Sequence, residues 1–185
     1  YAALAAIAIQ SNQNDQHGGQ SIPAFDYYMA PGVLHTFKKQ FKQRLYDYFE
    51  ISELFDEVEI NKIIEHVDTF DSITIDINEF KPYLKNQDHM KIIDKAYDKA
   101  VRITDRITFQ AMEAFIHNLN TMHSRAGAQV PFSSINFGTD TSPEGRMVIE
   151  NYLKALDAGL GKGETPIFPI AIFKVKEGVN YFPED

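Results

Sequence analysis

Small polar side chains gather where a short apolar segment of the chain stops. Ser133, Ser134 and Asn136 stand among the hydrophobic residues of this segment, and Gly138 ends it just before the start of a predicted helix. In α/β folds, ligands collect at the carboxyl ends of strands, and the N-terminus of a following helix favours phosphate. These four residues are therefore candidates for holding the phosphate and sugar of a substrate.

A capping explanation competes for the end of the same segment. Thr141 with Glu144 fits a capping box, and Pro143 suits the first turn of a helix. Helix capping explains the residue types at positions 141–144, but it explains fewer of those at positions 133–136. Both interpretations of the segment therefore stay open.

A second polar run, residues 11–21, follows an alanine-rich helical pattern. Its amides can pair with base edges or ribose hydroxyls, and its glycines let a backbone approach closely. Two polar residues of a predicted long helix offer further ribose partners, although an ordinary solvated loop and solvated helix are the alternative. The candidate nucleotide-binding residues are Asn12, Gln13, Asn14, His17, Gly18, Gly19, Gln20, Gln110 and Glu113.

Other patterns carry little chemistry. The glycine-rich residues 159–163 lack the spacing of a Walker loop and read as a helix stop. Glu113 and His117 lie one helical turn apart, which favours a hydrogen bond over a metal site. The sequence therefore predicts no metal ligands and no catalytic residue among these side chains.

Composition narrows the class of protein. The 185 residues are 44% hydrophobic and carry a net charge of -8, which argues against a nucleic-acid surface. The sequence contains no cysteine, so it supplies no thiol, disulfide or thiolate metal ligand. No apolar run reaches the roughly 18 residues that span a membrane, so no membrane partner is expected.

Periodicity predicts a mainly helical chain with a β-α-β segment near its end. Residues 14–32 read as a loop, and residues 70–87 as an ambiguous stretch with one short helix interrupted near Pro82. The strand–helix–strand order favours a parallel pair with a right-handed crossover. Helices are expected over residues 2–13, 34–49, 52–67, 88–122 and 143–158, and strands over 129–137 and 167–175.

The apolar seam of the predicted helix 88–122 is long. Its apolar residues recur every three or four positions from Met90 to Met122. A seam of this length is typical of a bundle or a subunit interface, so we expect self-association through this helix. Ser52 with Glu53 is a plausible cap for the helix before it.

Four sequence blocks, taken together, resemble the anaerobic (class III, glycyl-radical) ribonucleoside-triphosphate reductases. The resemblance covers nearly the whole chain and is loosest over residues 50–90. The blocks are residues 16–21 (QHGGQS), 124–127 (SRAG), 129–138 (QVPFSSINFG) and 165–169 (TPIFP).

The resemblance implies an α/β fold, with this chain as a mainly helical fragment of a ten-stranded α/β barrel. Residues 1–125 would form the effector and dimer region, and residues 126–185 a β-α-β barrel segment. The chain begins at Tyr1 within a helical pattern and ends at Asp185 after a strand, so we expect an internal fragment of a larger cytoplasmic protein.

The resemblance also implies the chemistry and its partners. The family reduces ribonucleoside triphosphates, and a deoxynucleoside triphosphate effector binds at the interface of a homodimer. A radical-SAM activating enzyme installs the glycyl radical with S-adenosylmethionine, while zinc and formate serve the complete enzyme. The radical loop, the functional cysteines and the ATP-binding cone lie outside these residues, so the fragment alone is expected to be inactive. A stand-alone nucleotide-binding or helical interaction module without catalysis is the alternative.

Overall fold

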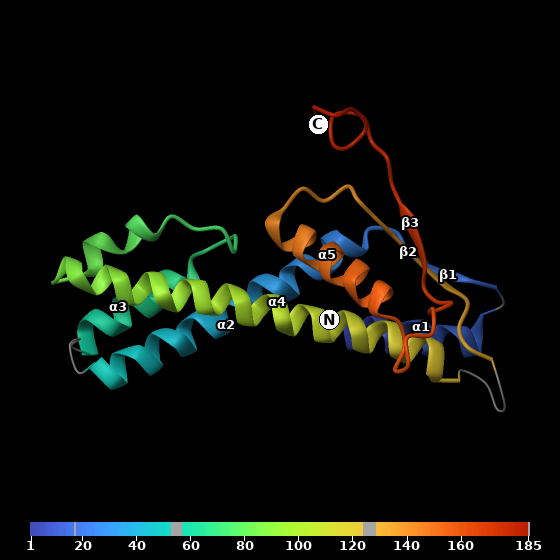
Figure 1. The fold of residues 1–185 in the computed structure, drawn as a ribbon, viewed down its shortest axis with the longest axis horizontal. Helices are drawn as coiled ribbons and strands as arrows, with labels where there is room; N and C mark the ends of the chain where they lie inside the picture. The colour runs from blue at the N-terminus through green and yellow to red at the C-terminus, as the bar shows by residue number, and fades with distance from the viewer. Residues whose placement is uncertain (17, 53–56, 124–128, 185) are drawn as a thin grey trace. The chain divides into compact units, whose positions relative to one another are not determined.

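The computed structural model describes residues 1–16, 18–52, 57–123 and 129–184 (Figure 1). The chain divides into two compact units, residues 1–32 with 107–185 (unit 1) and residues 33–106 (unit 2). The elements are α1 (Ala2–Asp15), β1 (Gln20–Ile22), α2 (Phe25–Ser52), α3 (Glu57–Asp68), the 3₁₀ helices η1 (Ile77–Tyr83) and η2 (Gln87–His89), α4 (Met90–Thr121), β2 (Ser133–Phe137), α5 (Pro143–Ala158) and β3 (Ile170–Phe173).

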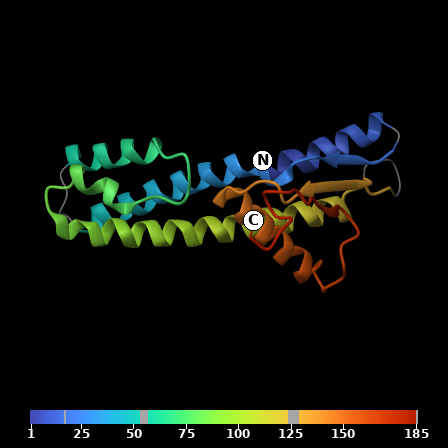
Figure 2. The ribbon, with the colours of Figure 1, turned by 90° about the horizontal axis from the view of Figure 1, so that it is seen from above.

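Unit 1 contains a three-stranded parallel sheet in the order β1-β2-β3. Figure 2 shows β1 and β2 side by side next to α1. The buried residues of β2 alternate with half-buried ones, so one face of the strand packs on helices and the other is open. On the helix side, Phe137 contacts Tyr152 of α5, with ring centroids 5.9 Å apart.

The core of unit 1 continues between α2, α4 and α5. Phe25 and Phe115 stack with ring centroids 5.1 Å apart, and Tyr152 lies 6.0 Å from Phe25. The Tyr152 hydroxyl donates to the carbonyl of Pro169 at 3.3 Å. Burial raises the pKa of this hydroxyl well above its usual value, so it remains a protonated donor that holds the chain entering β3.

Unit 2 has an aromatic core of its own. Phe41 contacts Phe80 and Tyr97 edge-on, with centroids 5.8 and 5.9 Å apart. The Tyr97 hydroxyl donates to the carbonyl of Ile73 at 3.0 Å, which fixes the segment between α3 and η1. The other buried apolar residues of this core include Phe37, Leu45, Ile63, Val67, Ile93, Ala96 and Ala100.

Several predictions of secondary structure are confirmed. The helix expected over 88–122 is α4, the helix expected over 143–158 is α5 with the same bounds, and the strands around α5 pair in parallel. Gly159 ends α5 with a φ of 75°, as the helix-stop interpretation requires. The short helix near Pro82 is η1.

The predicted loop over residues 14–32 is wrong. Residues 20–22 form β1, and α2 begins at Phe25 and includes Pro31. A proline within a helix costs about 3 kcal/mol, because it removes one hydrogen bond and crowds the preceding turn. The buried stripe Phe25, Met29, Val33 and Phe37 offsets that local cost through packing.

Two capping predictions also need correction. Ser142 caps α5 in place of Thr141, with its hydroxyl accepting from the backbone N–H of Gly145 at 3.0 Å. Asp140 accepts from the Ser142 backbone and hydroxyl at 2.8 and 2.9 Å, which fixes the cap one residue later than expected. Ser52 belongs to α2, while Glu53 lies outside the described residues.

The seam of α4 is mostly covered by the chain itself. Ile93, Ala100, Phe115 and Leu119 are at most 1% exposed, and only Met122 beyond the helix end is well exposed. The seam therefore gives no reason for self-association through this helix, because its apolar area is already removed from water.

Candidate functional site

The open face of the sheet carries a small polar cluster. Ser21 pairs with Ser134 in the β1–β2 register, and the Asn136 amide donates to the Ser21 hydroxyl at 3.5 Å. Ile170 and Ile172 of β3 lie opposite Ser134 and Asn136. The cluster of Ser21, Ser134 and Asn136 therefore offers hydroxyl and amide groups on a surface bordered by apolar side chains.

Ser133 occupies the other face of the same strand. It is 3% exposed and alternates with Ser134, so it lies on the helix side of the sheet. The structure thus separates the four candidates, and Ser133 and Ser134 lie at the start of β2 instead of at its carboxyl end as expected. Ser134 and Asn136 reach the open face, which Ser21 joins, whereas Ser133 does not. Ser21 was not among the predicted site residues, because the residues of β1 were expected to form a loop.

Gly138 has a backbone role. Its φ is 109°, and a Cβ there would lie 2.7 Å from an aromatic carbon of Phe173. Only glycine accepts this conformation and this close approach at little cost. Gly138 therefore lets the chain turn at the end of β2 beneath the Phe173 ring.

A buried carboxylate fixes that turn. Asp26 of α2 is 0% exposed and accepts from the backbone N–H groups of Gly138 and Asp140 at 2.7 and 3.2 Å. The Asn180 amide donates to the carbonyl of Gly138 at 2.6 Å. Neither Asp26 nor Asn180 was a sequence candidate, since each reaches the turn from a position more than 40 residues away.

A cavity of about 430 Å³ opens at this turn. Its polar lining includes Asp26, Asp140, Thr141, Arg146 and Asn180, and its apolar lining includes Leu153 and Phe173. Most of these polar groups already bind backbone groups. These side chains therefore stabilise the turn, while Thr141 and Arg146 lie exposed at the mouth of the cavity.

The polar run of residues 11–21 includes the last residues of α1, and two of its glutamines are used within the protein. The Gln20 amide donates to the carbonyl of Ile9 at 2.9 Å and approaches the Gln13 side-chain oxygen at 3.5 Å. Gln13 is 3% exposed. Asn12, Asn14 and Gly18 are exposed, and His17 lies outside the described residues.

Gly19 and Gln20 meet two of the strand residues in a small cavity. This cavity of about 190 Å³ is lined by Gly19, Gln20, Ser21, Phe132, Ser133, Ser134, Phe168 and Ile170. It lies where all three strands begin, because β1 starts at Gln20, β2 at Ser133 and β3 at Ile170. The structure thus brings part of the predicted loop site to the sheet.

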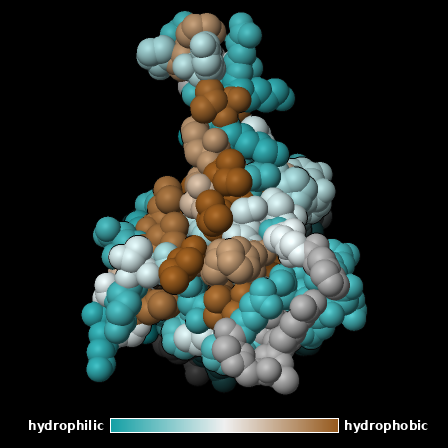
Figure 3. Space-filling model, turned by 90° about the vertical axis from the view of Figure 1, so that its right-hand side faces the viewer, coloured by the Kyte–Doolittle hydropathy of each residue, from teal (hydrophilic) through white to brown (hydrophobic). Residues whose placement is uncertain are grey.

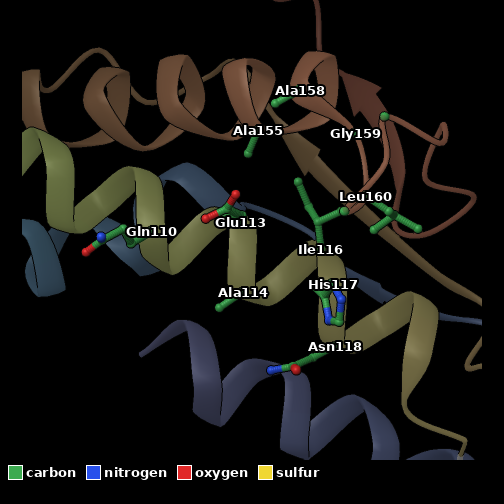
Figure 4. Close-up of a pocket in the computed structure, with 12 residues that line it drawn as sticks. Gln110, Glu113, Ala114, Ile116, His117, Asn118, Ala155, Ala158, Gly159 and Leu160 are labelled. Carbon is green, nitrogen blue, oxygen red and sulfur yellow. The ribbon is translucent and has the colours of Figure 1, made fainter.

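Gln110 and Glu113 lie in a different cavity, the α4 pocket. Its volume is about 470 Å³, and α4 forms one wall while the end of α5 and residues 159–163 form the other. Figure 4 shows Glu113 pointing from α4 toward Ala155 of α5, with His117 one turn further along α4. Residues 12–20, as far as the structure describes them, do not line this pocket. The α4 pocket therefore brings Gln110 and Glu113 together with the end of α5 and not with the polar run.

Residues 1–16, 18–52, 57–123 and 129–184 contain neither a cluster of metal-ligating side chains nor a helix suited to a membrane. Nowhere in these ranges do three or more His, Asp or Glu side chains come together as a metal site. The described helices include none with the length and apolarity needed to cross a bilayer.

Comparison with known proteins places the chain in a family. The family model described as anaerobic ribonucleoside-triphosphate reductase matches residues 1–185. The chain belongs to this family of oxidoreductases.

Curated relatives carry the same name. The anaerobic ribonucleoside-triphosphate reductase of Enterobacteria phage T4 is 36% identical over 107 residues, which are 57% of this chain. Those of Haemophilus influenzae and Escherichia coli are 30% and 31% identical over 131 residues, or 70% of the chain. The chain spans 17% of the length of each of these relatives.

Proposed function

We propose that this chain is part of a cytoplasmic enzyme that reduces ribonucleoside triphosphates to deoxyribonucleotides by radical chemistry. The family match over residues 1–185 carries the proposal. The polar cluster on the open sheet face supports it, because hydroxyl and amide groups suit ribose hydroxyls. The relatives' names supply the substrate class.

The proposed fold of the complete protein is a ten-stranded α/β barrel. All strands of the described sheet are parallel, and β3 at its edge is exposed along its whole length. Figure 3 shows hydrophobic side chains as a brown band along this segment; Ile170, Ile172, Phe173 and Val175 are 44–60% exposed. An apolar edge strand of this kind requires cover, and further strands of a barrel would provide it.

Within the barrel, the open face would line the substrate cavity. Ser21, Ser134 and Asn136 would orient the ribose, while Ile170 and Ile172 would exclude water from one side. The thiyl radical that the family's glycyl radical would generate needs a thiol, and the chain has no cysteine. The described residues also bring together no three His, Asp or Glu side chains that could hold the family's zinc. The radical-bearing groups would come from other parts of the polypeptide.

The α4 pocket is the proposed site of the deoxynucleoside triphosphate effector. Glu113 and Gln110 offer ribose and base partners, and the backbone of residues 159–163 lies opposite. Lys162 in the same loop, or a magnesium ion, would neutralise the phosphates. The homodimer and the radical-SAM activase remain part of the proposal, with the dimer contact outside the buried α4 seam.

The first prediction tests the enzyme as a whole. The protein encoded by the complete reading frame, activated anaerobically with its activase, S-adenosylmethionine and formate, is expected to form deoxynucleotides from ribonucleoside triphosphates. Residues 1–185 alone are expected to form none, because no thiol is present to carry a thiyl radical. Product is measured by chromatography of labelled nucleotides.

Unactivated full-length protein is the control. A full-length protein that binds nucleotides but never reduces them would support the module without catalysis. Deoxynucleotide formed by pure residues 1–185 would overturn the assignment of the radical chemistry to other segments.

The second prediction tests the α4 pocket. Glu113→Ala in the full-length protein is expected to weaken binding of the preferred deoxynucleoside triphosphate about tenfold or more, because a hydrogen bond to a charged group contributes roughly 1.5–3 kcal/mol. Calorimetry with dATP, dGTP and dTTP measures the affinity.

Glu65→Ala, at an exposed position of α3, is the matched control and should leave affinity unchanged. If Glu113→Ala binds all three nucleotides like the unmodified protein, the effector site lies elsewhere.

A further inference from the structure

One α4 side chain holds the segment that leads into β3. The Asn120 side-chain oxygen accepts from the backbone N–H groups of Ile167 and Phe168 at 2.9 and 3.1 Å. Its amide nitrogen donates to the carbonyl of Phe168 and to the carbonyl of Ile116, the latter at 2.7 Å. Asn120 thus binds the Ile167–Phe168 backbone much as a neighbouring strand would, and this amide clamp uses both ends of its side chain.

The amide clamp joins the same two chain segments that form the α4 pocket. One wall of the pocket runs along α4 to Asn118, and Asn120 follows within the next half turn. The other wall includes Gly163, and the clamped residues 167 and 168 follow it closely in sequence. Ile116 belongs to both features, since it lines the pocket and its carbonyl accepts from Asn120.

The amide clamp also reaches the sheet. Phe168 is 5% exposed and packs edge-on against Phe132, with ring centroids 5.0 Å apart. The carbonyl of Phe132 in turn accepts from the backbone N–H of Gln20 at 2.9 Å, at the start of β1. Two residues beyond Phe168, β3 begins and places Ile170 opposite Ser134 on the open face.

These contacts connect the pocket with the open face by a continuous set of packed and hydrogen-bonded groups. A ligand that changes the spacing between α4 and residues 159–163 must either move the clamped segment or strain the Asn120 bonds. Protein interiors transmit such displacements, because they are close-packed. Movement of the clamped segment shifts β3 and Phe168, and with them the borders of the polar cluster.

We propose that Asn120 is the positioning residue that couples occupancy of the α4 pocket to the shape of the substrate face. It touches neither the effector nor the substrate, and it acts through the backbone of residues 167–168. This inference rests on the proposed function, because it takes the α4 pocket as the effector site and the open face as the substrate site.

The test uses full-length protein with Asn120→Ala, Asn120→Asp and Thr121→Val. The alanine variant removes the whole clamp, whereas the aspartate variant keeps the acceptor and loses the donor to Phe168. Thr121→Val is the matched control. It removes a side-chain hydrogen bond to the carbonyl of His117 from the same helical turn and leaves residues 167–168 untouched.

Two quantities are measured with saturating dATP, dGTP or dTTP and without nucleotide. The first is the ratio of kcat/KM values for competing ribonucleoside triphosphates. The second is hydrogen exchange of the β3 amides, residues 170–173, which needs no turnover. Allosteric factors are typically about 5–150-fold, so loss of the clamp is expected to reduce the effector-dependent change in ratio about fivefold or more. The β3 exchange response should disappear with it, while effector affinity stays within about threefold.

The outcomes separate the inference from the function on which it rests. If Asn120→Ala and Asn120→Asp keep the full effector response in both measurements, the coupling role is wrong while the reductase assignment stands. If the unmodified protein binds deoxynucleotide but reduces no ribonucleotide, the enzyme assignment fails and the exchange experiment still decides the coupling. If no deoxynucleotide binds, both fail. Should the alanine variant not fold, the aspartate variant decides.

Discussion

Phe115→Asp is expected to unfold unit 1. Phe115 is 1% exposed and stacks on Phe25 in the middle of the unit 1 core. The substitution removes a large aromatic contact and buries an unpaired carboxylate, at a combined cost of about 5 kcal/mol or more. That cost approaches the whole stability of a typical domain, roughly 5–15 kcal/mol. Limited proteolysis and circular dichroism of the full-length protein measure the loss.

Met122→Asp is the control at the end of the same helix. Met122 is 46% exposed, so a carboxylate there remains in water and should leave proteolysis unchanged. The comparison also separates two roles of α4. A Phe115→Asp protein that stays folded and only dissociates into monomers would show that the residue belongs to a subunit interface and not to the core.

Asp26→Ala is expected to release the turn at the end of β2. The Asp26 carboxylate accepts from two backbone N–H groups of the turn and, through its other oxygen, from the N–H of Tyr27 at 3.0 Å. Without it these donors lose their partner within the protein, at a cost of roughly 3 kcal/mol. Hydrogen exchange at Gly138 and Asp140 should rise by about two orders of magnitude, and the urea midpoint should fall.

Two further variants test whether the turn is lost because the hydrogen bonds to Asp26 are removed. Asp26→Asn keeps the size of the side chain but offers one acceptor oxygen instead of two, so an intermediate loss is expected. Asp15→Ala, at an exposed position at the end of α1, removes the same charge from solvent and should change neither measurement. Equal exchange rates in Asp26→Ala and the unmodified protein would show that the turn is stable without the Asp26 carboxylate.

Where local signals were strong, sequence predicted the elements well. Residues 143–158 carry a proline in the first turn and a glycine just past the end, and α5 has those bounds. The apolar period of residues 88–122 likewise predicts α4, since its buried positions recur every three or four residues. The apolar positions up to Phe137 predict the strand β2 and its last residue, although its start was placed four residues too early, at residue 129.

Where structure depends on distant partners, sequence failed. β1 is three residues long and becomes a strand only through its register with residues 133–135. Pro31 looks like a helix breaker, yet α2 continues through it because its apolar stripe is buried. Asp26 has no local feature that marks it, since its importance comes from backbone groups more than 100 residues away.

The sequence by itself determined the family, the absence of a thiol, the long helix and the presence of polar residues at a strand end. These depend on residue identity and on short periodic patterns, which are local. The tertiary structure alone decided that Ser134 and Asn136 share the open face with Ser21 while Ser133 lies beneath, and that Gln110 and Glu113 line a pocket with the end of α5. It also brought Asn120 to residues 167–168. Such contacts join segments tens to more than a hundred residues apart, and packing in three dimensions sets them.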